Sequence, residues 1–456
     1  MKFVPSTKFI ILAAFVLLPV SVLASMMPSA TGTWIGLAAF LAAVAAFDAA
    51  FSRNRLAGIR VILPEVVRLS VGRDGRMPLS IENPDPTLRQ LRIGLAFPRE
   101  IYSPYPDMHA NLPDDSRNSV VDWPFKSSKQ GLYRLENCYL ETHSRLGFWA
   151  LRRTDSARAE IRVYPDLLRE RKRLAALFMN RGIGIHAQRQ VGKGKEFEQL
   201  REYLPGDSYE DIHWKATARR GQPITKVYQL ERTQQIYVVI DSSRLSARKS
   251  ALPGSDTSTV APGNFADSAT IVERFAAAAL VLGLAAERQG DVFGLLTFDD
   301  RVRNFVKAKN GRAQFNVCRD ALYTLRAQSV SPDFTEVFTF IASRIRRRAL
   351  LIFLTNLDDP VMAEGFTSQI DIISRKHLVL VNMLKPVGAE PVFTNPNVNS
   401  VDEIYQKLGG HLVWRHLRDT EKFLHRHGIG FYLLQDENLC TNLVSQYLTV
   451  KKRQVL

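Results

Sequence analysis

Cysteine is scarce in this sequence, and the three that occur lie far apart. Cys138, Cys318 and Cys440 are odd in number, and no two of them form a closely spaced pair. Such a set excludes a disulfide framework and lacks the spacing of zinc ligands. We therefore expect a reducing compartment in which all three thiols are free.

Ionisable side chains are missing from two stretches near the N-terminus. Residues 9–27 and 31–47 contain none, and Asp48 ends the second run. Each stretch approaches the roughly 20 apolar residues that span a bilayer. The first stretch alone could be a signal peptide, but a second run so close behind it favours a hairpin of two transmembrane helices within residues 1–52.

Basic residues flank this hairpin on both outer sides. Lys2 and Lys8 precede it, Arg53, Arg55 and Arg60 follow it, and the intervening loop has no Lys or Arg. The positive-inside rule then places both ends of the hairpin in the cytoplasm. We expect a multi-pass protein of the inner (cytoplasmic) membrane whose soluble domains face the cytoplasm.

Two soluble domains are predicted after the hairpin, and 456 residues suffice for them. Residues 58–165 contain short runs of alternating polarity, such as "MPLSIEN" and "LRIGLAF", separated by Pro, Asn, Asp and Gly. This pattern predicts an antiparallel β-sandwich of immunoglobulin-like type. No sustained helical period occurs in this region.

The pattern changes within residues 236–456. Continuous apolar runs at 236–241, 292–298, 349–355, 377–384 and 428–434 alternate with helical segments, of which 268–289 is the clearest. Strands that are apolar on both faces and alternate with helices predict a doubly wound, mostly parallel α/β sheet. Residues 166–235 link the two predicted domains.

The stretch "REYLPGDSYEDIHWKATARRGQP" (201–223) is the most distinctive part of this linker. A catalytic interpretation would use His213 as a base oriented by Asp207 or Asp211. The chain offers no recognisable nucleophile elbow, so we favour a structural or docking role. In that interpretation the charged residues form ion pairs, and Tyr203 and Trp214 anchor the segment on the α/β domain. The residues expected to matter are Arg201, Glu202, Tyr203, Pro205, Gly206, Asp207, His213, Trp214, Lys215 and Arg219.

These residues also carry a family resemblance. "GKGKEFEQLREYLPGD" followed by "IHWKATARRG" and a strand that ends in Asp resembles the DUF58 family. The resemblance implies membrane helices, a β-sandwich and a von Willebrand factor A-like α/β domain. It also implies an adaptor role beside MoxR-type AAA+ ATPases.

A von Willebrand factor A-like domain can carry a metal-ion-dependent adhesion site. Such a site needs Asp-x-Ser-x-Ser after the first strand, a later Thr, and an Asp after the fourth strand, all suited to Mg²⁺. Asp241, Ser243 and Thr335 fit, but Leu245 replaces the second serine and Asn356 replaces the final aspartate. We therefore expect no metal and no cofactor. Asp241 would then cap a loop, and Thr335 would begin a helix.

Asp358 is the remaining nearby carboxylate that could serve Mg²⁺. Because of Asp358, Mg²⁺ is the one cofactor that the sequence leaves open, although we expect none.

Three functions stay open at this point. The leading hypothesis is a membrane-anchored, non-enzymatic adaptor for a MoxR-type AAA+ ATPase and its protein clients. The second is a hydrolase that uses His213 and neighbouring acids. The third is an anion-binding module for nucleic acid or lipid headgroups, because the formal net charge is +16. No nucleic-acid motif supports the third hypothesis, so we expect no nucleic-acid partner.

Overall fold

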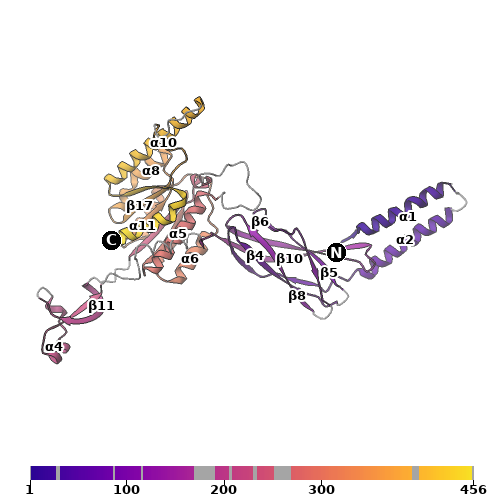
Figure 1. The fold of residues 1–456 in the computed structure, drawn as a ribbon, viewed down its shortest axis with the longest axis horizontal. Helices are drawn as coiled ribbons and strands as arrows, with labels where there is room; N and C mark the ends of the chain where they lie inside the picture. The colour runs from indigo at the N-terminus through magenta and orange to yellow at the C-terminus, as the bar shows by residue number, and fades with distance from the viewer. Residues whose placement is uncertain are drawn as a thin grey trace. The chain divides into compact units, whose positions relative to one another are not determined.

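The computed structural model describes residues 2–26, 31–85, 88–113, 117–168, 191–204, 208–229, 234–250, 269–392 and 400–453. The chain divides into two compact units. One holds Met1–Pro165, and the other holds Asp166–Val260 and Asp267–Leu456. Figure 1 shows the elements of each unit.

The first unit begins with β1 (Lys2–Pro5) and two apolar helices, α1 (Thr7–Met26) and α2 (Thr31–Ser52). Among the described residues, the window Ile35–Ser52 of α2 is long and apolar enough to cross a membrane. The apolar part of α1 that is described in full, Thr7–Val22, is shorter. The stretch without ionisable side chains ends at Asp48, but α2 continues past it to Ser52 and the Asp48 side chain is buried.

Two antiparallel layers follow these helices. One sheet has the order β1-β10-β9-β5-β7, with β3 pairing in parallel with β10, and the other has the order β2-β4-β8-β6. Alternate side chains of both sheets, including Ile81, Trp123, Leu140 and Ile161, form one buried core. The strands are β2 (Arg60–Ile62), β3 (Val66–Ser70), β4 (Asp74–Glu82), β5 (Gln90–Leu95), β6 (Ile101–Tyr102), β7 (Met108–Asn111), β8 (Asn118–Ser127), β9 (Gly131–His143) and β10 (Trp149–Tyr164).

The second unit contains a six-stranded sheet with the order β15-β14-β13-β16-β17-β18. All its strand pairs are parallel except β14 with β15. The prediction of a mostly parallel α/β sheet is confirmed, and the order is consistent with a von Willebrand factor A-like domain. The strands are β13 (Gln235–Asp241), β14 (Val292–Phe298), β15 (Val302–Lys309), β16 (Leu350–Leu354), β17 (Leu378–Leu384) and β18 (Gly430–Leu434).

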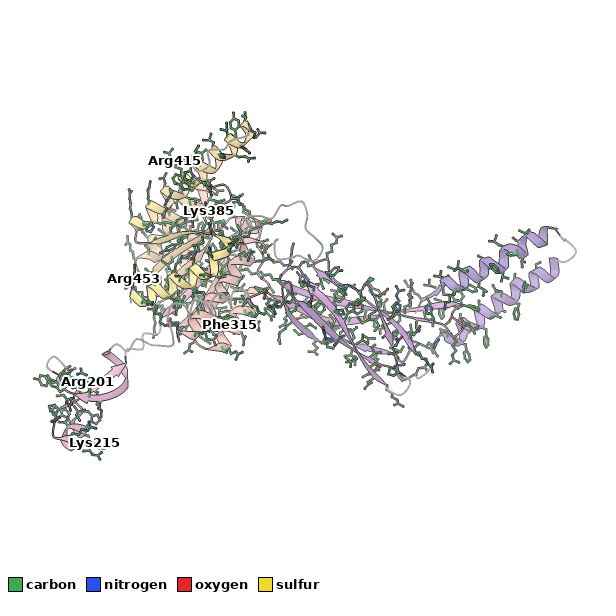
Figure 2. The ribbon with its side chains drawn as sticks, in the orientation of Figure 1. Arg201, Lys215, Phe315, Lys385, Arg415 and Arg453 are labelled. Carbon is green, nitrogen blue, oxygen red and sulfur yellow. The ribbon has the colours of Figure 1, made fainter. Side chains whose placement is uncertain are left out.

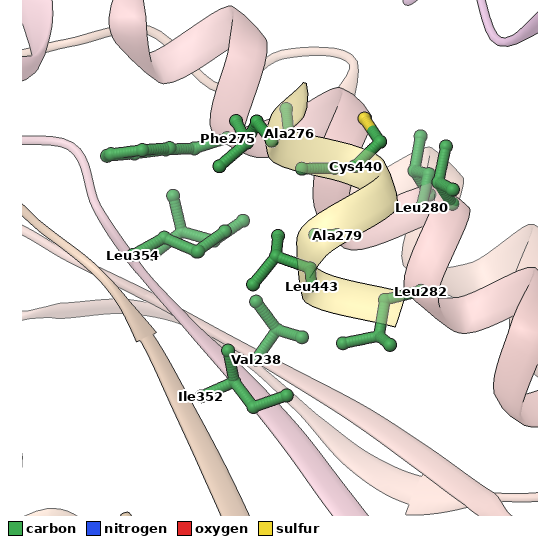
Figure 3. Close-up of a cluster of buried hydrophobic side chains, with 14 of the residues drawn as sticks. Val238, Phe275, Ala276, Ala279, Leu280, Leu282, Ile352, Leu354, Cys440 and Leu443 are labelled. Atoms are coloured by element: carbon green, nitrogen blue, oxygen red, sulfur yellow. The ribbon is translucent and has the colours of Figure 1, made fainter. Parts of the chain in front are cut away.

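Helices cover both faces of this sheet (Figure 1). Ile236, Val238 and Ile240 of β13 face a core with α5, α6 and α11, part of which is shown in Figure 3. Tyr237 and Val239 face a second core with α7, α8, α9 and α10. This two-sided burial explains why the strands read as continuous apolar runs. The helices are α5 (Ile271–Arg288), α6 (Arg312–Leu322), α7 (Phe334–Arg344), α8 (Pro360–Gln369), α9 (Asp371–Ser374), α10 (Val401–Arg426) and α11 (Leu439–Arg453).

A separate antiparallel pair precedes the sheet in sequence. It consists of β11 (Val191–Glu202) and β12 (Ile224–Gln229), with the short helix α4 (Trp214–Arg220) between them. The signature segment identified from the sequence lies in this β11–α4–β12 element. Pro205, Gly206 and Asp207 fall outside the described residues.

Candidate docking surfaces

His213 acts as the N-terminal cap of α4. Its Nδ1 accepts the backbone N–H of Ala216 at 3.0 Å, and its own backbone N–H donates to the Ile224 carbonyl at 2.8 Å. The Nδ1 atom therefore acts as the hydrogen-bond acceptor that caps the helix end. Gly221 ends α4 in the left-handed region at φ +68°. This geometry supports a structural role for His213.

The aromatic side chains of this element are largely exposed. Trp214 is 70% exposed and Tyr209 is 75% exposed, while Tyr203 stacks on Tyr209 with ring centroids 5.8 Å apart. The prediction that Trp214 is a buried anchor is wrong. The reason is local: Ile212 and Ile224 already fill the inner side of the element, and Trp214 begins the helix on its outer side.

The predicted ion-pair brace is also incomplete. Within the described part of the chain, Lys215 and Arg219 make no ion pair. Arg201 places Nη1 3.4 Å from the backbone carbonyl of Glu202. Exposed cations and aromatic rings at this density suit contact with another molecule better than they suit internal bracing.

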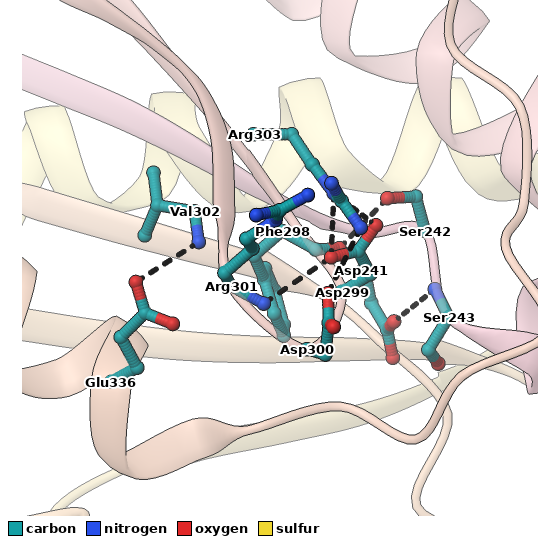
Figure 4. Close-up of polar contacts among 10 residues, drawn as sticks. All are labelled: Asp241, Ser242, Ser243, Phe298, Asp299, Asp300, Arg301, Val302, Arg303 and Glu336. Carbon is teal, nitrogen blue, oxygen red and sulfur yellow. Dashed lines mark hydrogen bonds and ion pairs between the residues drawn. The ribbon is translucent and has the colours of Figure 1, made fainter.

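Asp241 lies at the carboxyl end of β13 and is fully buried. Its Oδ1 accepts the backbone N–H of Ser243 at 2.8 Å, and its Oδ2 accepts the Thr355 hydroxyl at 2.7 Å (Figure 4 shows the Ser243 bond). Burial raises the pKa of Asp241, and the hydrogen bonds from Thr355 and Ser243 oppose that rise. Asp241 thus caps the loop after β13 and joins it to the end of β16.

Arginines occupy the other carboxylates at this edge of the sheet. Arg303 Nε lies 2.6 Å and 2.8 Å from the two oxygens of Asp299, which is fully buried (Figure 4). Burial would raise the pKa of Asp299, but hydrogen bonds led by Arg303 outweigh it and lower the pKa. Arg248 forms an ion pair with one oxygen of Asp358 through Nη1.

These contacts leave few free oxygens for Mg²⁺. Thr335 is exposed in the first turn of α7, Leu245 is buried, and Asn356 donates its amide N–H to a serine hydroxyl at 3.3 Å. The buried Ser243 Oγ and Asp358 Oδ1 have no hydrogen-bond partner among the described residues. No cluster of three or more His, Cys, Asp or Glu suited to a metal occurs among the described residues. The residues therefore do not fit an octahedral Mg²⁺ site.

Helix α10 has two apolar faces. One face packs on the sheet through Val413, Leu417 and Leu424. At Gly410 an added Cβ would lie 2.0 Å from the Gly388 carbonyl oxygen, so the helix touches backbone there and needs glycine. The opposite face carries a row of exposed apolar side chains, which we call the outward stripe: Val401, Ile404, Tyr405, Leu408 and Leu412.

The outward stripe was not predicted from the sequence, although its spacing was available there. Successive members are one, three or four residues apart, which places them on one side of a helix. Ile404, Leu408 and Leu412 are 51%, 47% and 58% exposed. Charged side chains of both signs adjoin the stripe: Asp402 and Glu403 lie in the first turn of α10, and Arg415, labelled in Figure 2, follows Leu412. An exposed apolar row of this length is typical of a contact surface.

The fold and these surfaces define a class of protein with apolar N-terminal helices, antiparallel sheets and an α/β domain. Residues 199–391 match the family described as "Protein of unknown function DUF58". This part of the chain is therefore a DUF58 domain, as the signature segment predicts. No curated protein matches the sequence.

Three solved structures are similar to part of this chain. BatB, a conserved hypothetical protein from Bacteroides thetaiotaomicron, is 12% identical with a TM-score of 0.27, over 48% of this chain and 99% of that one. An aerotolerance-related membrane protein from Bacteroides fragilis is 12% identical with a TM-score of 0.26, over 47% and 97%. An uncharacterised membrane-spanning protein from Vibrio fischeri is 17% identical with a TM-score of 0.16, over 48% and 98%. Likeness at this level supports no conclusion about function.

Proposed function

We propose that this chain is a membrane-anchored, non-enzymatic adaptor that docks a MoxR-type AAA+ ATPase and helps it act on client proteins. Helices α1 and α2 would supply the anchor because residues 9–27 and 31–47 carry no ionisable side chain. The DUF58 domain would supply one docking surface, the β11–α4–β12 element, and helix α10, which follows the matched residues, would supply the other. The ATPase as partner follows from the family resemblance of the signature segment.

The outward stripe of α10 is the observation that carries this proposal. Its side chains gain nothing from the chain's own core, because that core is served by the opposite face of the helix. Arg415 is exposed three residues after Leu412, where it would meet an acidic side chain of the partner. Trp214 and Tyr209 on the β11–α4–β12 element would form a second contact.

Co-purification tests this function. The full chain is extracted with a mild detergent from cells that also produce a MoxR-type ATPase, and the ATPase recovered with it is quantified. Leu408→Glu places a charge in the stripe and should reduce recovery at least several-fold. Gln406→Glu adds the same charge at an exposed position outside the stripe and should leave recovery unchanged.

Two results would count against the proposal. Failure to recover the ATPase with the unaltered chain would remove the partner. Equal recovery with Leu408→Glu would remove α10 as the docking face.

The hydrolase alternative makes a different prediction about His213. A cap residue contributes to folding, so His213→Ala should lower the stability of α4 by about 0.5–2 kcal/mol. Loss of a hydrolytic activity in a variant of unchanged stability would instead favour the enzyme.

Orientation is the remaining part of the proposal. We place the soluble domains in the cytoplasm because the Lys and Arg residues flank the outer ends of the hairpin. A reporter that is active only in the cytoplasm, fused after Leu456, should be active. An inactive fusion at normal abundance would reverse the topology and separate the chain from any cytoplasmic ATPase.

A further inference from the structure

The turn between β9 and β10 lies against the ends of α1 and α2. Ser6 precedes α1 and donates its hydroxyl to the Gly147 carbonyl at 2.5 Å and its backbone N–H to the Phe148 carbonyl at 2.8 Å. Trp149 donates its indole N–H to the Ala45 carbonyl of α2 at 2.8 Å. We call residues 144–149 the interface turn, and these bonds hold it to both helices.

Asp48 provides a further contact from the same helix. It is only 2% exposed, and its Oδ1 accepts the backbone N–H of Leu146 at 3.1 Å. Ser52 accepts the backbone N–H of Arg145 at 3.1 Å and donates to Asp48 at 3.4 Å. An acidic residue in an apolar helix normally has a specific partner, and here the partner is the backbone of the interface turn.

Exposed apolar side chains surround this junction. Leu146 is 56% exposed, and Phe47 and Phe51 of α2 are 67% and 58% exposed. The two phenylalanine rings stack with centroids 5.8 Å apart, and the Arg145 guanidinium lies 4.5 Å from the Phe51 ring centre. Lys8 and Arg53 are exposed nearby in sequence, at the two helix ends.

Aromatic and basic side chains at the ends of apolar helices are typical of the membrane–water interface. There the ring meets the upper acyl region while the cation reaches a lipid phosphate. A water-soluble partner would need to cover a surface that is continuous with the apolar helices themselves. The bilayer covers it without any further protein.

We propose that the interface turn is immersed in the headgroup layer of the bilayer, with Leu146, Phe47 and Phe51 in lipid and Arg145 on anionic lipid phosphates. This inference rests on the proposed membrane anchor. Because the turn is bonded to both helices, the β-sandwich would be seated on the membrane in a fixed orientation. Asp48 is the positioning residue that holds the interface turn at this depth in the headgroup layer.

Depth measurements with nitroxide spin labels test whether the interface turn lies in the headgroup layer. The full chain, with its three buried cysteines replaced by alanine, is reconstituted in vesicles of phosphatidylcholine and phosphatidylglycerol. Labels are placed at Leu146→Cys, at Ile11→Cys on α1, and at Val120→Cys on β8; the parent side chains are 56%, 62% and 68% exposed. Collision with oxygen reports lipid, and collision with a water-soluble nickel complex reports water.

The label at 11 should be shielded from nickel, the label at 120 should be open to it, and the label at 146 should be shielded at an intermediate depth. A label at 146 as open to nickel as the one at 120, with 11 still shielded, would overturn this inference alone. A label at 11 that is open to nickel would overturn the membrane anchor itself. Shielding at 146 with spin–spin broadening that disappears on dilution with unlabelled chain would mean a second copy, and would also overturn the inference.

Two substitutions sharpen the result. Asp48→Ala removes the acceptor and should increase the mobility of the label at 146, whereas Asp48→Asn keeps an acceptor oxygen and should not. Arg145→Gln should reduce shielding in vesicles containing phosphatidylglycerol and have no effect in phosphatidylcholine alone. Free inorganic phosphate should not compete with the lipid, and competition by it would assign Arg145 to a soluble anion. If Asp48→Ala leaves the mobility of the label at 146 unchanged, Asp48 does not position the interface turn.

Discussion

Asp291 is expected to hold the C-terminal helix α11 on the α/β domain. It precedes β14 and is 2% exposed. Its Oδ1 accepts the backbone N–H of Gln234 at 3.0 Å, and its Oδ2 accepts Lys451 Nζ at 2.8 Å and the Tyr447 hydroxyl. One carboxylate therefore connects the start of β13 to two turns of α11.

The loss of unfolding free energy in Asp291→Ala follows from the buried donors that the substitution leaves without an acceptor. The Tyr447 hydroxyl and the Gln234 N–H are buried, and a buried donor that loses its partner costs about 1–3 kcal/mol. The Lys451 side chain is 26% exposed and can return to water at little cost. The substitution should therefore destabilise the α/β domain by about 3–5 kcal/mol. Asp291→Asn keeps one acceptor oxygen and should cost about half as much.

Urea unfolding of the full chain in detergent, followed by circular dichroism, measures this change. Lys452→Ala is the matched control, because Lys452 is an exposed neighbour on the same helix and should change stability by no more than about 0.5 kcal/mol. If Asp291→Ala also stays within about 1 kcal/mol of the parent chain, then α11 is held by its apolar face alone and our account of the carboxylate is refuted.

Three further predictions use other parts of the structure. Burial lowers the pKa of His377 to about 4, so the contribution of the neutral imidazole to stability is complete above the ordinary pKa near 6.5 and is lost as the pH falls toward 4. The free energy of unfolding should fall by about 3 kcal/mol across this range, and His377→Leu should flatten the dependence of the urea midpoint on pH. Millimolar Mg²⁺ should not raise the melting temperature, whereas a rise that Asp241→Ala abolishes would show a working metal site. Trp214→Ala should change the free energy of unfolding by about 0.5 kcal/mol or less because the ring is 70% exposed. A loss of several kcal/mol would show that the ring is buried in solution.

The parallel strands could be predicted from the sequence because both faces of each are buried. Val292–Phe298, for example, is apolar or small at every position except Thr297, and the predicted range matches the strand residue for residue. The edge strand β15 (Val302–Lys309) was not predicted. It is partly exposed along its length and carries Arg303, Lys307 and Lys309. Its sequence therefore lacks the continuous apolar run of the central strands and resembles a polar loop.

Two local features of the N-terminal unit could not be predicted for a different reason. The strand β1 (Lys2–Pro5) is defined by its pairing with Trp149–Arg152 of β10, which lies far away in sequence. Asp48 looks like a helix terminator when only its charge is considered. The Leu146 N–H that donates to its Oδ1 comes from a turn nearly a hundred residues later, and no local pattern in the sequence indicates that partner.

The two faces of α10 show why the docking surfaces were harder to predict than the core. Leu417 and Leu424 are buried, whereas Leu408 and Leu412 on the same helix are about half exposed, yet all four are leucines at helical spacing. Periodicity predicts that an apolar face will be covered, but it does not identify what covers it. For Leu417 and Leu424 the cover is the sheet of the same chain. For Leu408 and Leu412 that sheet lies on another side of the helix and none of the described residues covers them. We propose that a second molecule does, so Leu408→Glu should disturb association while leaving the fold intact.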